Sequence, residues 1–286
     1  MTILNPSLTL DPKSFVEIWR HEEIRVVCLR PPVLEDHPDL PVRIRGALGR
    51  ILADMPPPMS YRHDPFNRPR AFPYLFGDAA TARPLAIACD IVGRELTVTI
   101  SLFGSARIWS DQVREALLQA LTEGISMRTE GRVRYPLKPI DCMVRTTSAA
   151  PPSAVINQTT FRFLSPVAVR DGARLSASPA SLLWAMITRI RNLAGWFGVS
   201  LEEDWAELHK ICLEARVNDS TLLPIYFRRY SQRQRDRRIP MMGFVGTIRM
   251  EGDLSRLAAF LTLSNYTHIG SHAALGFGRT LTITYA

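Results

Sequence analysis

The chain has 286 residues, a length that suits two domains of roughly 140 residues each. Hydrophobic residues make up 46% and charged residues 22% of it, which excludes an intrinsically disordered protein. The formal net charge is +8, and of the 35 basic residues only Lys13, Lys138 and Lys210 are lysines. Arginine binds phosphate through two parallel hydrogen bonds, so a nucleic-acid partner is one explanation. The codon use of a GC-rich genome is the other, and only clustering of the arginines can separate the two.

The cysteines and the hydropathy pattern indicate a soluble protein. Cys28, Cys89, Cys142 and Cys212 lie far apart in the sequence, a spacing that matches neither a zinc-binding cluster nor a redox pair. Each has apolar neighbours, so we expect buried structural thiols. No apolar run approaches the ~20 residues of a membrane span, and no signal peptide is visible. We therefore expect a cytoplasmic protein without a membrane partner.

In the N-terminal half the periodicity predicts strand, helix, strand, strand, helix and strand, at residues 24–29, 41–55, 85–92, 95–103, 110–124 and 133–145. The first helix has an apolar stripe that includes Ile44, Leu48 and Ile51, while Arg43 and Arg50 lie on another face. Ser110 is expected to cap the second helix. Residues 56–84 fit no element.

The C-terminal half repeats this order at residues 161–169, 179–198, 223–230, 241–250, 254–261 and 281–285, with an extra helix at 205–216. Ser178 is expected to cap the helix that Pro179 begins. The order βαββαβ is that of a ferredoxin-like domain. We therefore predict an α+β protein with two tandem ferredoxin-like (RRM-like) domains, at 1–148 and 159–286. The polar, proline-containing stretch 149–158 is the expected linker.

Glycines at 270, 276 and 278 mark a loop, 268–279, just before the last strand. Glycine leaves backbone amides unshielded, so such a loop can hold phosphate oxygens. The loop lacks the Gly-Lys-Ser/Thr ending of a nucleotide-binding P-loop, which makes ATP or GTP a poor expectation. We expect contact with RNA, by these residues: His268, Gly270, Ser271, His272, Gly276 and Gly278.

Six arginines cluster between two apolar strands, at positions 228, 229, 233, 235, 237 and 238. In an extended ribbon, Arg229, Arg233, Arg235 and Arg237 share one side. Tyr226 and Tyr230 add surfaces for base stacking. A solvated face is the alternative, but so many arginines on one hairpin favour phosphate binding. We expect the following to contact RNA: Arg228, Arg229, Arg233, Arg235, Arg237 and Arg238.

The loop, the basic hairpin and the paired halves resemble the CRISPR-associated endoribonucleases of the RAMP superfamily, which process precursor crRNA. That family carries the pattern G-h-G-x5-G-h-G, where h is apolar, near its C-terminus. Here His268-Ile269-Gly270 is followed, after five residues, by Gly276-Phe277-Gly278, so a histidine replaces the first glycine. Residues 243–261, which lead into the loop, also resemble this family, as do 45–50 and 72–76.

The resemblance implies cleavage of CRISPR repeat RNA at the base of a stem-loop, without a metal ion or other cofactor. A 2′-hydroxyl attacks the adjacent phosphate, and the products carry a 2′,3′-cyclic phosphate and a 5′-hydroxyl. Many members stay on their product, and other CRISPR effector subunits are possible partners. A non-catalytic crRNA-binding scaffold is the alternative. A DNA-binding regulator ranks last, because no recognition helix is visible.

The resemblance also implies a catalytic histidine on or beside the first helix, but residues 41–55 contain none. His37 precedes this helix and His63 follows it, so both are candidates for the general base. Arg43 and Arg50 are alternatives that would act by stabilising charge. His21 and His209 are expected at the surface. Residues 56–84 are either a basic finger that touches RNA or a surface loop.

Overall fold

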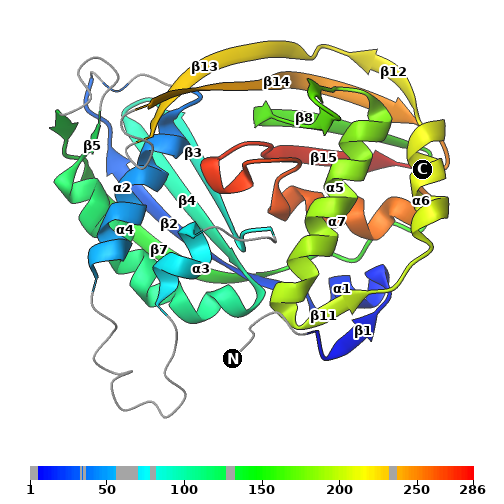
Figure 1. The fold of residues 1–286 in the computed structure, drawn as a ribbon, viewed down its shortest axis with the longest axis horizontal. Helices are drawn as coiled ribbons and strands as arrows, with labels where there is room; N and C mark the ends of the chain where they lie inside the picture. Colours follow the sequence, from blue (N-terminus) through cyan, green and yellow to red (C-terminus); the bar gives the residue numbers. More distant parts are fainter. Residues whose placement is uncertain are drawn as a thin grey trace.

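The computed structural model describes residues 6–32, 34, 37–55, 70–77, 82–126, 133–231 and 237–286. Two antiparallel sheets stand side by side, each covered by helices on one face (Figure 1). This is the predicted pair of ferredoxin-like units. No helix in the described part of the chain is long and apolar enough to cross a membrane.

The N-terminal sheet has the strand order β3-β4-β2-β7 and is antiparallel throughout. Its strands are β2 (Arg20–Leu29), β3 (Leu85–Val92), β4 (Glu95–Phe103) and β7 (Lys138–Ser148). Helices α2 (Leu40–Asp54) and α4 (Ser110–Glu123) cover one face. Ile44, Leu48 and Ile51 are buried as the apolar stripe predicts.

The C-terminal sheet has the order β12-β14-β8-β15, and β13 also pairs with β14. Its strands are β8 (Gln158–Val167), β12 (Arg216–Ser220), β13 (Leu223–Ser231), β14 (Arg237–Glu251) and β15 (Thr280–Tyr285). The same half contains three helices, α5 (Pro179–Ala194), α6 (Trp205–Glu214) and α7 (Ala258–Thr267). The long hairpin of β13 and β14 arches from this sheet over the N-terminal half (Figure 1).

The start of the chain crosses to the C-terminal half. Strand β1 (Leu8–Leu10) pairs in parallel with β11 (Val199–Leu201), and α1 (Pro12–Ile18) follows it. One continuous hydrophobic core includes side chains from both halves, such as Leu48 and Leu193. The division at 149–158 therefore stays a prediction. The remaining short elements are α3 (Ala71–Phe76), β5 (Ile125–Ser126), β6 (Arg134–Tyr135), β9 (Arg170–Asp171) and β10 (Arg174–Leu175).

The local predictions are confirmed in part. Ser178 caps α5 as predicted, because its side chain accepts a hydrogen bond from the Ser181 amide. Ser110 is instead inside α4, and its buried hydroxyl has no partner. The helix α3 lies within the stretch for which we predicted no element, and most of that stretch lies outside the described residues. His21 is fully buried rather than at the surface, and it accepts a hydrogen bond from the indole of Trp19 at 3.1 Å.

The prediction of four buried cysteines is half correct. All four are free thiols, and Cys28 and Cys212 are buried. Burial raises the pKa of Cys28 to about 11 and that of Cys212 to about 12, so both stay protonated. Cys89 is partly buried, and Cys142 is exposed because it lies on the edge strand β7.

Arg189 of α5 ties the two halves together from a buried position. Its Nη1 and Nη2 atoms donate to the carbonyl oxygens of Arg83 and Leu85, at 3.0 and 3.4 Å. Its Nε donates to the carbonyl oxygen of Thr267, at 3.3 Å. Burial, together with the charge of Arg83, lowers the pKa of Arg189 to about 10, so the side chain is still a cation at neutral pH. The entry to β3 is thus held to the end of α7.

The glycine-rich loop, residues 268–279, presses against the N-terminal half at this seam. Gly276 has φ 86°, and a Cβ there would collide with the ring of Pro41 in the first turn of α2. Gly278 has φ 71°, and a Cβ would collide with the carbonyl oxygen of Ile269. Both positions therefore require glycine for close approach as well as for conformation.

His268 occupies the position at which the family pattern has a glycine, and its φ is 59°. Its backbone is in a region that side chains rarely adopt, and burial of the ring compensates for the strain. The ring is 5% exposed and its Nδ1 lies 3.0 Å from the carbonyl oxygen of Phe277, to which it donates. Burial lowers its pKa to about 3, so the imidazole is neutral.

We expect Arg189→Met to destabilise the protein by about 2–3 kcal/mol, since three buried carbonyl groups lose their donor. Urea unfolding at neutral pH measures the loss. Arg191→Met is the matched control, because Arg191 is exposed on the same helix. Equal stability of the two variants would show that the buried hydrogen bonds do not hold the halves together.

The lowered pKa of His268 predicts acid sensitivity. Below its ordinary pKa of 6.5 the unfolded chain takes up a proton that the folded chain, with a pKa of about 3, does not. Stability therefore falls as the pH falls through this window, by up to about 1.4 kcal/mol per pH unit. Between pH 7 and pH 5, we expect the wild type to lose about 2 kcal/mol more than His268→Asn in urea unfolding. Parallel losses would contradict the buried neutral imidazole.

Candidate functional site at the seam between the halves

Three segments meet at the seam: the start of α2, the glycine-rich loop and the β13–β14 hairpin (Figure 1). A small hydrophobic cluster joins them, made of Val42, Ala168, Phe227, Met241, Leu275 and Phe277. Phe227 of β13 lies 5.7 Å from Phe277 of the loop, between ring centroids. On its other side, Phe227 lies 6.0 Å from the ring of His37. Apolar packing therefore fixes the hairpin and the loop beside His37.

His37 belongs to a short hydrogen-bonded chain at the beginning of α2. Its Nδ1 lies 2.7 Å from Oδ1 of Asp39. Arg43, one helical turn further on, donates from Nη2 to Oδ2 of Asp39 at 2.9 Å. The side chain of Asp39 is 7% exposed and that of Arg43 is 13% exposed, whereas His37 is 20% exposed. The inner members are thus shielded, and the imidazole borders the surface.

This arrangement suits a general base. A short contact with a carboxylate favours a proton on Nδ1 of His37, which leaves Nε2 as a lone-pair acceptor. The Asp39 amide also lies 3.2 Å from Nδ1, but it cannot donate there while Nδ1 carries the proton. Asp39 would orient the ring and stabilise the imidazolium, as the acid of a catalytic triad does. Arg43 would then act as a positioning residue, because it contacts Asp39 and not the imidazole.

The hairpin presents two different faces. Ile225, Phe227 and Arg229 alternate on the inner face, and Phe227 is buried. Tyr226 and Arg228 point outward and are exposed, as is Arg238 on the paired strand β14. Arg233 and Arg235 lie outside the described residues, as do the side chains of Arg237 and Tyr230. Arg229, predicted to face RNA in the open, is half-buried, and burial lowers its pKa.

Many backbone N–H groups of the glycine-rich loop are already hydrogen-bonded within the protein. Six of its backbone N–H groups donate to backbone carbonyl oxygens, those of Ile269, Ser271, Leu275, Gly276, Phe277 and Gly278. The N–H of Arg279 donates to the Ser165 hydroxyl at 2.9 Å. Gly276 and Gly278 are buried, so they shape the loop instead of presenting donors to phosphate. Ser271 and His272 are exposed and can reach a ligand. The predicted presentation of bare amides to phosphate is therefore wrong for Gly276 and Gly278, and contact of RNA with Gly270 stays a prediction.

Of the other predicted catalytic residues, Arg50 is not brought to the seam. Arg50 forms an ion pair with Glu123 of α4 at 2.7 Å, toward the far end of α2 from His37. His63 lies outside the described residues, together with Arg62 and Arg68 of the expected basic finger. In contrast, Asp39 was missed, although its spacing of two residues from His37 and four from Arg43 is a readable signal.

Further cations at the seam also escaped the sequence analysis. Arg279 donates to Oδ1 of Asp90 in β3 at 2.6 Å and so adds an ion pair across the seam. Desolvation of the His272 ring by neighbouring atoms, followed by the charges of Arg229, Arg170 and Arg83, lowers the pKa of His272.

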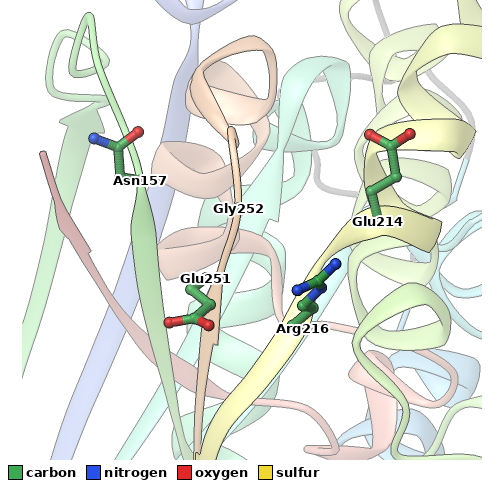
Figure 2. Close-up of a pocket in the computed structure, with 5 residues that line it drawn as sticks. All are labelled: Asn157, Glu214, Arg216, Glu251 and Gly252. Carbon is green, nitrogen blue, oxygen red and sulfur yellow. The ribbon is translucent and has the colours of Figure 1, made fainter.

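A hollow of about 400 Å³ lies elsewhere, at the edge of the C-terminal sheet (Figure 2). It is lined by Asn157, Glu214, Arg216, Glu251 and Gly252. It is wide open to solvent, and its two carboxylates give it a different character from the basic seam. Within the ranges that the structure describes, no three His, Cys, Asp or Glu side chains converge as metal ligands.

Known proteins resemble this chain in sequence over part of its length and in fold over most of it. Residues 161–280 match the sequence model of the family "CRISPR-associated endoribonuclease Cas6". No curated protein sequence matches the chain significantly.

Solved structures match nearly the whole chain. A Cas6 product complex is similar with a TM-score of 0.58 and 15% identity, over 92% of this chain and 99% of the other. A second Cas6 product complex gives 0.57 and 16%, over 93% and 100%. The Thermus thermophilus Cas6 gives 0.57 and 13%, over 93% and 99%. At such low identity this likeness shows the fold, and it covers both halves of the chain. The match to the Cas6 family model covers residues 161–280, in the C-terminal half.

Proposed function

We propose that the protein cleaves CRISPR repeat RNA into mature crRNA and that His37 is the general base. The observation that carries this proposal is the series of hydrogen bonds from His37 to Asp39 to Arg43, which lies beside the basic hairpin and the glycine-rich loop. The match of residues 161–280 to the Cas6 family model supports RNA cleavage as the reaction class. The residue roles rest on the geometry.

The chemistry follows from the free Nε2 of His37. This nitrogen removes the proton of a 2′-hydroxyl, and the oxygen attacks the adjacent phosphorus. The bond from phosphorus to the 5′ oxygen breaks, and that oxygen takes up a proton from a general acid or from solvent. The products are a 2′,3′-cyclic phosphate and a 5′-hydroxyl. Guanidinium groups at the seam would stabilise the charge that develops on the phosphate oxygens. Because a histidine base and guanidinium groups would supply the proton acceptor and the charge stabilisation, we propose that no metal ion is needed.

The proposed substrate is the stem-loop of a CRISPR repeat, held by the arginines of the hairpin. Among the structures of similar fold are Cas6 product complexes and a Cas6 substrate mimic complex. By analogy we propose that this protein also keeps its product, which would let it deliver crRNA to other CRISPR subunits.

We expect His37→Ala to lower the single-turnover cleavage rate of a labelled repeat RNA by at least about 100-fold, because the base is lost. RNA affinity should change less than threefold. Asp39→Asn should also slow cleavage, since the ring loses its orienting carboxylate. His209→Ala is the control, because this histidine is exposed on α6. The assay is run in EDTA, and products are tested for a cyclic phosphate.

Each outcome of this assay has a definite reading. Wild-type cleavage rates in His37→Ala would remove His37 from its proposed role. Cleavage that stops in EDTA would contradict metal independence. A wild-type protein that binds the RNA, and so lowers its mobility in a gel, but leaves it intact would be a crRNA-binding scaffold.

We expect the triple variant Arg233→Ala, Arg235→Ala and Arg237→Ala to weaken RNA binding and its salt dependence. Each lost phosphate contact should reduce the slope of log K against log salt by roughly 0.7 for single-stranded RNA. Affinity measurements across a salt series give the slope. A control triple variant, Arg191→Ala, Lys210→Ala and Arg216→Ala, removes the same charge from exposed positions on α5, α6 and β12. Identical slopes in the two variants would show that the hairpin arginines are a solvated face and do not contact RNA phosphates.

A further inference from the structure

We propose that strand β7 is an edge at which two copies of this chain associate, so that their N-terminal sheets join into one antiparallel sheet. Strands β7 and β3 are the opposite edges of the N-terminal sheet, and β3 is the edge that contacts the glycine-rich loop at the seam. The inference therefore goes beyond the proposed function and does not depend on it.

Two of the other sheet edges are covered by parts of the chain. An open edge presents unpaired N–H and C=O groups to any strand that approaches it, and proteins commonly protect such edges. The glycine-rich loop covers β3, with Gly276 close to the carbonyl oxygen of Ile87. The side chain of Asn265 covers β15, because it accepts from the Thr282 amide at 2.8 Å and donates to the Thr282 carbonyl at 3.4 Å.

The remaining edge of the C-terminal sheet is formed by β12 and β13. Strand β12 has five residues, and its register with β14 shifts between Val217 and Asp219. Strand β13 carries Pro224, which has no N–H, and Arg228 and Arg229, which would repel the same strand of a second copy. Short length, a bulge, proline and like charges all disfavour pairing at this edge.

Strand β7 lacks such protection along most of its length. It has 11 residues, and among the described strands it pairs with β2 alone. Its apolar side chains Ile140, Met143 and Val144 are 48, 41 and 39% exposed. A long edge strand with exposed apolar side chains is a ready template for pairing with another strand.

Two side chains of β7 point to the helix-covered face of the sheet and still reach solvent. Cys142 and Val144 lie opposite Val26 and Ile24 of β2, which are fully buried. The helices therefore cover β2 but do not cover the edge strand completely. A second copy paired with β7 would bury this row, and burial of apolar surface favours association.

The charges on β7 select one register for the pair. When a two-fold axis passes through Met143, residue 141 of one copy lies directly opposite residue 145 of the other. Asp141 then faces Arg145 of the second copy, and the symmetry forms this pair twice. Opposite charges across an antiparallel pair stabilise it, whereas like charges destabilise it. An axis through residue 141 or 145 would place like charges opposite each other, and an axis through 142 or 144 would give neither charge an opposite partner.

Arg145 is held at the edge by its own sheet. Its side chain is 61% exposed, and its Nε donates to Oε2 of Glu23 on β2 at 2.8 Å. A guanidinium group has five N–H donors, so this contact leaves donors for Asp141 of the second copy.

The same register joins the apolar side chains of the two copies. Met143 meets Met143 of the second copy at the axis, and Cys142 lies across from Val144. Pro139, which has no N–H, limits the pairing to about residues 140–146. One strand pair of this length is smaller than a standard interface, so we expect a weak dimer with a Kd on the order of 10 μM.

This dimer would leave both seams accessible. The two-fold axis lies at β7, while the glycine-rich loop of each copy lies against the opposite edge strand, β3. Each copy would bind its own RNA, and dimerisation would need no RNA.

Sedimentation velocity of the RNA-free wild type, at about 1–100 μM protein, tests the association. We expect a shift from monomer to dimer in this range. Asp141→Arg should raise the Kd at least about tenfold, since it sets two arginines opposite each other in both pairs. Asp219→Arg is the matched control and should keep the wild-type Kd, because it makes the same change of charge on the exposed edge strand β12. A wild type that stays monomeric throughout, or an Asp141→Arg variant that dimerises like it, would overturn the proposal.

A charge swap separates a lost contact from a lost fold. Arg145→Glu sets two acids opposite each other, so we expect this variant to be monomeric as well. In an equimolar mixture of Asp141→Arg and Arg145→Glu, every charge at position 141 faces an opposite charge at 145, and we expect a heterodimer. If both variants have wild-type circular dichroism and the mixture stays monomeric, the proposed pairing is wrong.

Disulfide formation reads the register. We expect Met143→Cys, in a Cys142→Ser background, to form a cross-linked dimer under mild oxidation. Directly opposite residues of an antiparallel pair lie about 4.5–5.5 Å apart between Cα atoms, within the reach of a disulfide. Cross-linking of the wild type through Cys142, without cross-linking of that variant, would contradict the register. Dimers that appear only after RNA is added would show bridging by RNA and would overturn the edge pairing.

Discussion

The contact between the glycine-rich loop and the first turn of α2 organises the rest of the molecule. Gly276 lies against Pro41. Pro41 follows Asp39 by two residues and precedes Arg43 by two. The same helix start therefore carries both the packing surface and the chain of groups that orients His37. Because a Cβ at position 276 would collide with Pro41, the loop can approach this closely only with glycine there. Packing and the candidate chemistry thus depend on one surface.

The seam also concentrates positive charge out of water. Arg189 is satisfied by three carbonyl oxygens, and Arg279 by Asp90, so these two cations hold the halves together. His268 is close to Arg189 and Arg279, and burial together with these charges keeps it neutral. Paired cations therefore build the seam, and the buried histidine beside them adds no further charge.

Much of the fold was predictable because its signals are local. The stripe of Ile44, Leu48 and Ile51 has helical spacing, and the cap at Ser178 needs only its neighbours. The role of Arg189 was not predictable, since its partners belong to segments about a hundred residues away in the chain. Ser110 was wrong for a related reason: Trp109 precedes the helix and takes the cap position, which the serine signal does not reveal.

The candidate site divides in the same way. His37 was predictable from its place before α2, whereas the ion pair of Arg279 with Asp90 forms only in the tertiary fold. The glycine pattern was read as a set of bare amides, but the amides of Gly276 and Gly278 already bond within the protein. Conformation explains the pattern better: positions 268, 270, 276 and 278 all have positive φ, and His268 holds one of them at a cost that its buried hydrogen bond to Phe277 offsets. Internal hydrogen bonds and close packing thus fix the backbone of the loop, and the exposed side chains of Ser271 and His272 are the parts that it can offer to a ligand.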